Sequence, residues 1–216
     1  MEQRTPEWHQ VRLGIPTGSR IGDATAKTKT GWSSSRENYM AELLTERLTG
    51  QPAPQYSNAA MEFGTQVEPE ARAAYEFTRN LSVQQIGFLP HPTLRSGASP
   101  DGVVEGNPRG LVEIKCPNTA THIATLLGAP IDLKYLKQMQ WQMVCANAQW
   151  CDWVSYDPRL PDNLRMVIRR VPRDDKMIAG LELDIRLFIE EMDAKYAALM
   201  GLGESHLMAQ LQASAA

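Results

Sequence analysis

Long apolar runs are missing from this sequence of 216 residues. No stretch approaches the ~20 apolar residues that a membrane-spanning helix needs, so no membrane partner is expected. The first ten residues, MEQRTPEWHQ, also lack the basic start and apolar centre of a secretory signal. We therefore expect a cytoplasmic protein.

Cysteine is scarce, and an excess of positive charge is missing. The three cysteines, Cys116, Cys145 and Cys151, are an odd number at spacings that fit no zinc module, so we expect reduced thiols rather than a disulfide framework. With 22 Lys and Arg against 25 Asp and Glu, the formal net charge is -3, which argues against a protein that is basic all over. Nucleic acid is still an acceptable partner if basic residues gather on one surface.

Internal repeats and low-complexity linkers are missing too, so we expect one domain over residues 1–216, with 202–216 as a weakly determined tail. Apolar residues at helical spacing predict helices near residues 34–49, 62–80, 133–149 and 175–200. We expect Ser34 and Asp174 to begin the first and last of these, and Gly50 and Gly201 to end them. Short β-type runs between residues 83 and 116, at 150–158 and at 164–171 predict an α/β protein with a mixed sheet.

The run LVEIKCP, residues 111–117, combines an acid and a lysine with a strand pattern. Side chains alternate along a strand, so Glu113 and Lys115 are expected on one face, with Val112, Ile114 and Cys116 on the other. An acid two residues before a lysine occurs by chance about once in a chain of this length, so by itself the pair indicates no more than a solvated face.

The turn SPDG, residues 99–102, strengthens the case for a site. A hairpin between this turn and the run 111–116 brings Asp101 to Glu113. Two close carboxylates repel unless a cation neutralises them, and such hard oxygen ligands suit Mg²⁺ or Mn²⁺. That metal polarises a phosphate oxygen and acidifies bound water, while Lys115 acts either as a base or as an electrostatic helper. An ordinary Pro-Asp-Gly turn is the alternative for SPDG.

Six short motifs follow one another along the chain in the order in which a known protein family has them: WHQVRLGIPTGS, EFGTQVEPEAR, SPDG, VEIKCP, QMQWQM and YDPR. With Asp101 followed by Glu113-Ile114-Lys115, they resemble the phage lambda exonuclease family, also called YqaJ-type viral recombinases, within the PD-(D/E)xK nucleases. The resemblance implies a three-layer α/β/α restriction-endonuclease-like core. It also implies an enzyme that degrades one strand of duplex DNA from its 5′ end to mononucleotides, leaving a 3′ overhang.

Site residues follow from the same resemblance. It implies that Asp101, Glu113, Glu68 and the carbonyl of Ile114 bind metal, with two ions per site, and that Lys115 is the catalytic lysine. Gln138 matches a glutamine near the metals, although it also fits the polar side of a helix. A terminal 5′ phosphate would be held by three residues, which are Arg12, Ser19 and Ser99. For the first of these, a surface arginine is the alternative.

Further partners rest on the resemblance as well. A homotrimer ring around DNA, a single-strand annealing protein and an origin in a phage or prophage of a bacterial host are implied. The segment from 24 to 36 mixes basic and aromatic residues suited to a DNA channel, namely Lys27, Lys29, Trp32 and Arg36. Two other functions stay open: an endonuclease or nicking enzyme with the same motif, and a DNA-end binding module without catalysis.

Overall fold

The computed structural model describes residues 3–54 and 58–214, with side chains described as far as residue 203. Its main sheet has the strand order β5-β6-β7-β8. Pairing is antiparallel for β5 with β6, parallel for β6 with β7 and antiparallel for β7 with β8, so the sheet is mixed, as predicted. The four strands are β5 (Gly102–Val104), β6 (Gly110–Lys115), β7 (Trp150–Tyr156) and β8 (Met166–Pro172).

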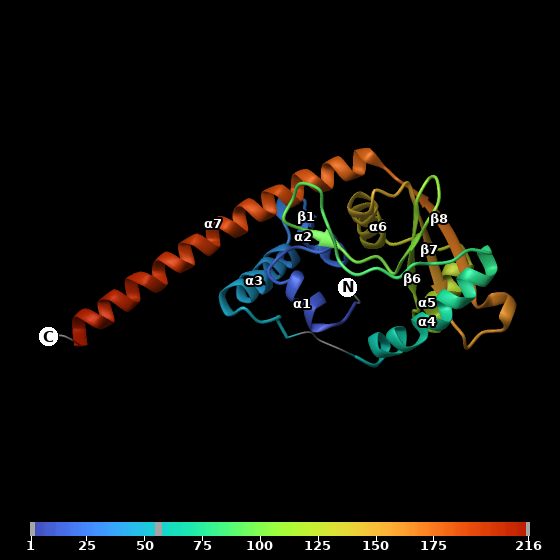
Figure 1. The fold of residues 1–216 in the computed structure, drawn as a ribbon, viewed down its shortest axis with the longest axis horizontal. Coiled ribbons are helices and arrows are strands. Elements are labelled where there is room, and N and C mark those ends of the chain that lie inside the picture. The colour runs from blue at the N-terminus through green and yellow to red at the C-terminus, as the bar shows by residue number, and fades with distance from the viewer. Residues whose placement is uncertain (1–2, 55–57, 215–216) are drawn as a thin grey trace.

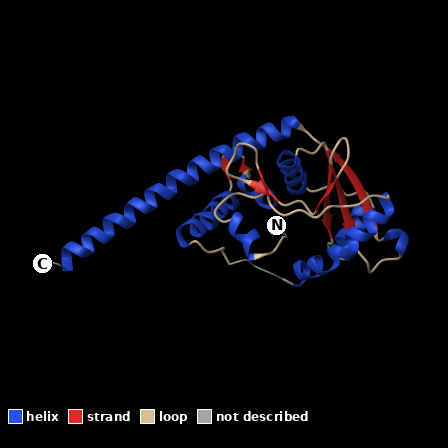
Figure 2. Ribbon diagram, in the orientation of Figure 1, coloured by secondary structure: helices blue, strands red, loops and turns tan. Residues whose placement is uncertain are grey.

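Helices cover both faces of this sheet, which confirms the three-layer α/β/α class (Figure 2). On one face α4 (Ala59–Arg79) packs Ala71 and Tyr75 against apolar side chains that include Val112 and Ile114. On the other face α6 (Leu133–Ala146) packs its methionines against Leu111 and neighbouring residues. The alternation of β6 between the two cores is therefore the one predicted from its sequence.

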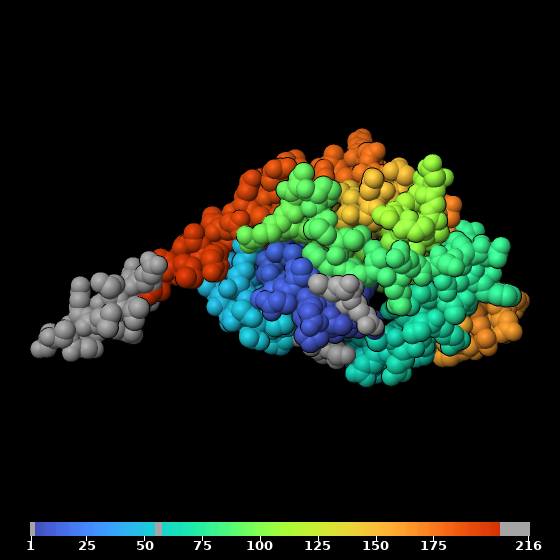
Figure 3. All heavy atoms as spheres, in the orientation of Figure 1, coloured from blue at the N-terminus to red at the C-terminus, as the bar shows by residue number. Residues whose placement is uncertain are grey.

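A helical half adjoins the sheet and carries its own core (Figure 1). Apolar side chains of α7 (Asp175–Ser214), such as Ile185 and Phe188, pack against Tyr39 and Met40 of α3 (Ser34–Thr49). In Figure 1 the red, C-terminal part of α7 extends away from the body, whereas the orange part of the same helix lies against it, as Figure 3 also shows. The remaining elements here are α1 (Pro6–Val11), η1 (Gly18–Arg20), α2 (Ile21–Ala24), β1 (Lys27–Thr28) and β2 (Gly31–Trp32).

Helix ends were predicted only in part. Gly50 ends α3 with a φ of 66°, and the Asp174 carboxylate accepts the N–H of Met177 as expected. The N-cap of α3 is Ser33 rather than Ser34, because the Ser33 hydroxyl accepts the N–H of Arg36. Gly201 does not end α7, since one glycine costs a helix only about 1 kcal/mol relative to alanine.

The middle of the chain contains less strand and more helix than predicted. Residues 83–89 form one isolated bridge, from Gln84 to Val103, before the two-residue strand β3 (Leu89–Pro90), which pairs with β4 (Gly97–Ala98). An unpredicted helix, α5 (Thr119–Leu126), follows β6, and η2 (Asp162–Leu164) precedes β8. None of the helices in the described part of the chain is both long and apolar enough to cross a membrane.

Candidate active site

An open end of strand β6 forms the centre of the site. Strand β5 pairs with β6 only as far as Gly102 opposite Val112, so Glu113, Ile114 and Lys115 continue beyond it. Asp101 lies just before β5, and its Oδ2 accepts the Ile114 N–H at 2.7 Å. The hairpin therefore brings Asp101 beside Glu113, as predicted. Because the N–H and C=O of one strand residue point to the same edge, the Ile114 carbonyl faces the same side as Asp101.

Glu113 and Lys115 share a face, but that face is not the solvated one. Helix α6 covers it, and Glu113 is 0% exposed. The Lys115 ammonium lies 2.5 Å from Glu113 Oε1 and 5.0 Å from the centre of the Tyr135 ring. The simple alternative of a charged pair on a solvated strand is therefore wrong.

Two amides from α6 hold the Glu113 carboxylate. Gln138 Nε2 donates to Oε1 at 2.7 Å, and Gln142 Nε2 donates to Oε2 at 2.6 Å. The polar face of α6 is thus buried against the site instead of facing solvent. The family resemblance indicated Gln138, whereas Gln142 was missed because its partner is 29 residues away in the sequence.

Buried negative charge exceeds the positive charge available to it. Burial, together with the charges of Glu113 and Glu68, raises the pKa of Asp101 well above its usual value. For Lys115 burial lowers the pKa, but the two carboxylates outweigh it, and the pKa lies above the usual value. One ammonium thus faces two carboxylates, which leaves the site short of a cation.

The donor set fits a hard divalent cation. Carboxylate and carbonyl oxygens are the ligands of Mg²⁺ and Mn²⁺, and Mg²⁺ keeps several waters while binding through one or two carboxylates. Asp101 and Glu113 with the Ile114 carbonyl supply such a set. Over residues 3–54 and 58–203 no group of three or more His, Cys, Asp or Glu side chains is close enough to hold a metal, so this set is limited to two carboxylates.

Glu68 lies near the pair without joining it directly. Its charge raises the pKa of Asp101, but its own oxygens accept N–H groups of Arg72 at 2.6 Å and Arg4 at 3.1 Å. Glu68 lies well inside α4, nine residues after the helix begins at Ala59. Two arginines, rather than a helix dipole, therefore compensate this carboxylate.

A cavity of about 530 Å³ adjoins the helical half of the molecule. Arg12 and Ser19, the residues predicted to hold a terminal phosphate, both line it. Tyr39, Arg20 and Met61 also contribute to its wall. Tyr39 was not predicted as part of a site; its hydroxyl accepts the Thr17 N–H and keeps its own hydrogen for another acceptor.

Trp8 connects this cavity to the acidic pair. The Arg12 guanidinium lies over the Trp8 ring, 3.6 Å from its centre. The indole N–H of Trp8 donates to Ser99 Oγ at 2.9 Å. An indole only donates, so Ser99 accepts here and its own hydrogen remains available. Only Pro100 separates Ser99 from Asp101 in the chain, so the contacts of Trp8 link Arg12 to the turn that carries Asp101.

The basic segment between β1 and α3 is only partly exposed. Lys27 and Lys29 are exposed, and Trp32 lies between Lys27 and Arg36. Arg36, however, is 1% exposed and pairs with Glu191 at 2.7 Å. The prediction that Arg36 contacts DNA is therefore wrong, because its guanidinium is buried and lies 4.2 Å from the centre of the Trp32 ring.

Comparison with known proteins places this site in a family. The model of the YqaJ-like viral recombinase domain matches residues 7–149, which include the acidic pair, Gln138 and the cavity arginine. The chain belongs to the YqaJ-like viral recombinase family. No curated protein sequence matches it.

Solved structures agree with the family. A structure titled as LHK-Exo in complex with dAMP is 46% identical, with a TM-score of 0.86, over 93% of this chain and 99% of that one. The alkaline exonuclease LHK-Exo from Laribacter hongkongensis is also 46% identical, with a TM-score of 0.85 and the same coverage. A phage-related exonuclease from Haemophilus somnus 129PT shares the fold, with a TM-score of 0.67 at 14% identity over 86% of this chain and 96% of that one.

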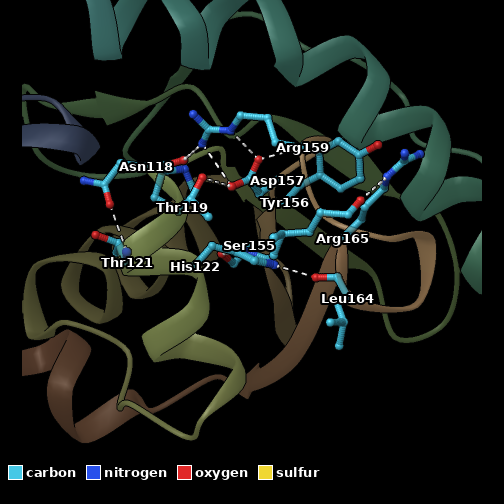
Figure 4. A network of polar contacts seen from close by, with 12 residues as sticks. Asn118, Thr119, Thr121, His122, Ser155, Tyr156, Asp157, Arg159, Leu164 and Arg165 are labelled. Atoms are coloured by element: carbon cyan, nitrogen blue, oxygen red, sulfur yellow. Dashed lines mark hydrogen bonds and ion pairs between the residues drawn. The ribbon is translucent and has the colours of Figure 1, made fainter.

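The YDPR motif, residues 156–159, forms a network of polar contacts around the buried Asp157 at the end of β7 (Figure 4). Asp157 accepts N–H groups from Arg159 at 2.7 and 3.0 Å and the hydroxyl of Thr119 at 2.7 Å. Arg159 also donates to the Pro117 carbonyl and lies over the ring of Phe63 in α4. This arginine therefore fixes the chain two residues after Lys115 and joins it to α4.

The same network predicts a pH-dependent stability. Burial alone would raise the pKa of Asp157, but the donors from Arg159 and Thr119 outweigh it and bring the pKa down to about 2. A carboxylate with a lowered pKa stabilises the fold above its usual pKa of about 3.9, and this contribution is lost as the pH falls towards 2. We expect Asp157→Asn to lower the free energy of unfolding at pH 7 by about 2 kcal/mol, since one pKa unit is worth about 1.4 kcal/mol.

Urea unfolding between pH 7 and pH 2 measures this difference. The difference in the free energy of unfolding between the wild type and Asp157→Asn should disappear as the pH approaches 2. Asp162→Asn is the matched control, because that side chain is 91% exposed and pairs only at the surface. A gap that stays constant across the pH range would contradict the assignment.

Proposed function

We propose that this protein is a divalent-cation-dependent 5′-to-3′ exonuclease that acts on the ends of double-stranded DNA. It would release mononucleotides and leave a 3′ overhang for phage-type recombination by strand annealing. The observation that carries the proposal is the continuity from the cavity of Arg12, through Trp8 and Ser99, to Asp101. A pocket that holds a terminal phosphate and is linked in this way to the acidic pair would select a DNA end and set the direction of digestion.

Each group has a task in this reaction. Asp101, Glu113 and the Ile114 carbonyl would hold Mg²⁺ or Mn²⁺, with Glu68 beside a second ion. The bound cation supplies a polarised phosphate oxygen and a more acidic water. Gln138 orients Glu113, and Lys115 places positive charge where the pentacoordinate phosphate gains negative charge. Arg12, Ser19 and Ser99 donate to the terminal phosphate.

Two related structures support this proposal. LHK-Exo is described as an alkaline exonuclease and was solved with dAMP. A deoxynucleoside monophosphate is the product expected when one strand is cleaved nucleotide by nucleotide. Exposed Lys27 and Lys29 beside Trp32 would contact the duplex, and the homotrimer ring and the annealing partner are proposed on the family resemblance.

Linear duplex DNA labelled at either the 5′ or the 3′ terminus tests the proposal. With Mg²⁺ the 5′ label should appear in mononucleotides at once, while the 3′ label stays in long single strands. EDTA should prevent both the release of the 5′ label and the formation of long single strands. Early release of the 3′ label would contradict the polarity.

Closed circular DNA separates the alternatives. An endonuclease or nicking enzyme cuts it, whereas the proposed exonuclease leaves it intact until an end is made. Binding of DNA ends without any degradation in Mg²⁺ would instead favour the non-catalytic module.

A further inference from the structure

Hydrogen-bond donors contact both oxygens of the Glu113 carboxylate, and the two oxygens have different partners. Its Oε1 accepts from both Lys115 and Gln138, whereas Gln142 supplies the N–H at Oε2. The two glutamines are four residues apart on α6, so they lie on one face of the helix. Gln142 is therefore the residue that sets the position of the second oxygen.

The orientation of the Gln142 amide is fixed by this contact. Its NH₂ group must face Glu113, because an amide oxygen beside the carboxylate would repel it. Gln142 is 1% exposed, and within the described residues its Oε1 is buried with no hydrogen-bond partner. An unpaired buried acceptor opposes folding, and an apolar side chain would avoid that cost. That cost is offset by the hydrogen bond that the same amide donates to the buried Glu113 carboxylate, whose Oε2 accepts it at 2.6 Å.

The same side chain also lies close to the turn that carries Ser19. A Cβ placed on Gly18 would lie 2.9 Å from the Ala98 Cβ and 3.8 Å from the Gln142 Cγ. Gly18 begins η1, and Ser19 follows it into the cavity wall. Gln142 therefore donates to the acidic carboxylate and lies close to the turn proposed to hold phosphate.

We propose that Gln142 is a positioning residue that orients Glu113 Oε2 for the divalent cation. The inference rests on the proposed function, since it assumes that Glu113 binds a cation. Groups that hydrogen-bond to metal ligands typically change metal affinity by 10- to 100-fold when they are removed. Gln142→Met keeps the length and volume of the side chain and removes only its polar group, so Mn²⁺ affinity should fall at least tenfold.

Gln140 provides the matched control. It lies on the same helix and is 3% exposed, but it donates to the Pro172 carbonyl and accepts the Asp174 N–H, away from the acidic pair. Gln140→Met should therefore lower the melting temperature while Mn²⁺ affinity stays within twofold of the wild type. If Gln142 only stabilised the fold, Gln142→Met would likewise lower the melting temperature and leave Mn²⁺ affinity within twofold of the wild type.

Mn²⁺ binding is measured on the DNA-free protein by titration calorimetry or by loss of the free-ion electron paramagnetic resonance signal, with thermal unfolding of each variant. Gln142→Leu replaces the methionine variant should that one not fold. Wild-type affinity in a folded Gln142 variant, or an equal loss in Gln140→Met, overturns the inference while the proposed function stands. Failure of the wild type to bind Mn²⁺ or to degrade labelled duplex overturns both.

Discussion

Lys115→Ala should reduce turnover on linear duplex DNA by about 10²-fold or more, while binding to the duplex survives. A positioned charge that meets developing negative charge in the transition state is typically worth that much. The ammonium lies 2.5 Å from Glu113 Oε1, at the end of β6 that β5 does not cover. Single-turnover digestion of end-labelled DNA measures the loss, and a mobility-shift titration in Ca²⁺ measures binding.

Lys134→Ala is the control for this substitution. Both lysines lie close to the Tyr135 ring, at 5.0 Å for Lys115 and 4.8 Å for Lys134. Lys134 is exposed and has Asp132 as its ion-pair partner at 3.7 Å, away from the acidic pair. Its loss should change turnover less than threefold. Turnover retained in Lys115→Ala would remove Lys115 from the site, and equal losses in both variants would point to the ring packing instead.

The strand that carries the site could be predicted because its signal is local. The alternation of β6 is a period of two residues, and the hairpin from Asp101 to Glu113 spans only 12 positions. Both were predicted from the letters of the sequence. What covers the strand could not be predicted in the same way, since the burial of Glu113 depends on where α6 packs.

Contacts between distant segments account for the residues that were missed. Trp8 contacts Ser99 across 91 positions, and Gln142 contacts Glu113 across 29. Neither contact therefore leaves a periodic pattern in the sequence from which it could be predicted. The error over Arg36 has the same origin. Composition marks it as a surface cation, whereas tertiary packing buries it against Glu191.

Arg12→Ala should reduce the preference for 5′-phosphorylated over 5′-hydroxyl ends by about tenfold or more. A hydrogen bond to a charged group contributes about 1.5–3 kcal/mol, and 1.4 kcal/mol is a factor of ten. The Arg12 side chain is held flat on Trp8, and one N–H reaches the Thr17 hydroxyl at 3.4 Å. Its Nε is buried without a partner in the described residues, which leaves a donor for an anion.

Initial rates on the two kinds of end, measured for the wild type and each variant, give the preference directly. Arg20→Ala is the control within the same cavity, because Arg20 already pairs with Asp23 at 2.6 Å and Glu42 at 2.9 Å. A cation whose charge is compensated has less to offer a phosphate, so this variant should keep most of the preference. Equal rates of the wild type on both kinds of end would refute a phosphate-binding role for Arg12. A larger loss of preference in Arg20→Ala would assign that role to Arg20 instead.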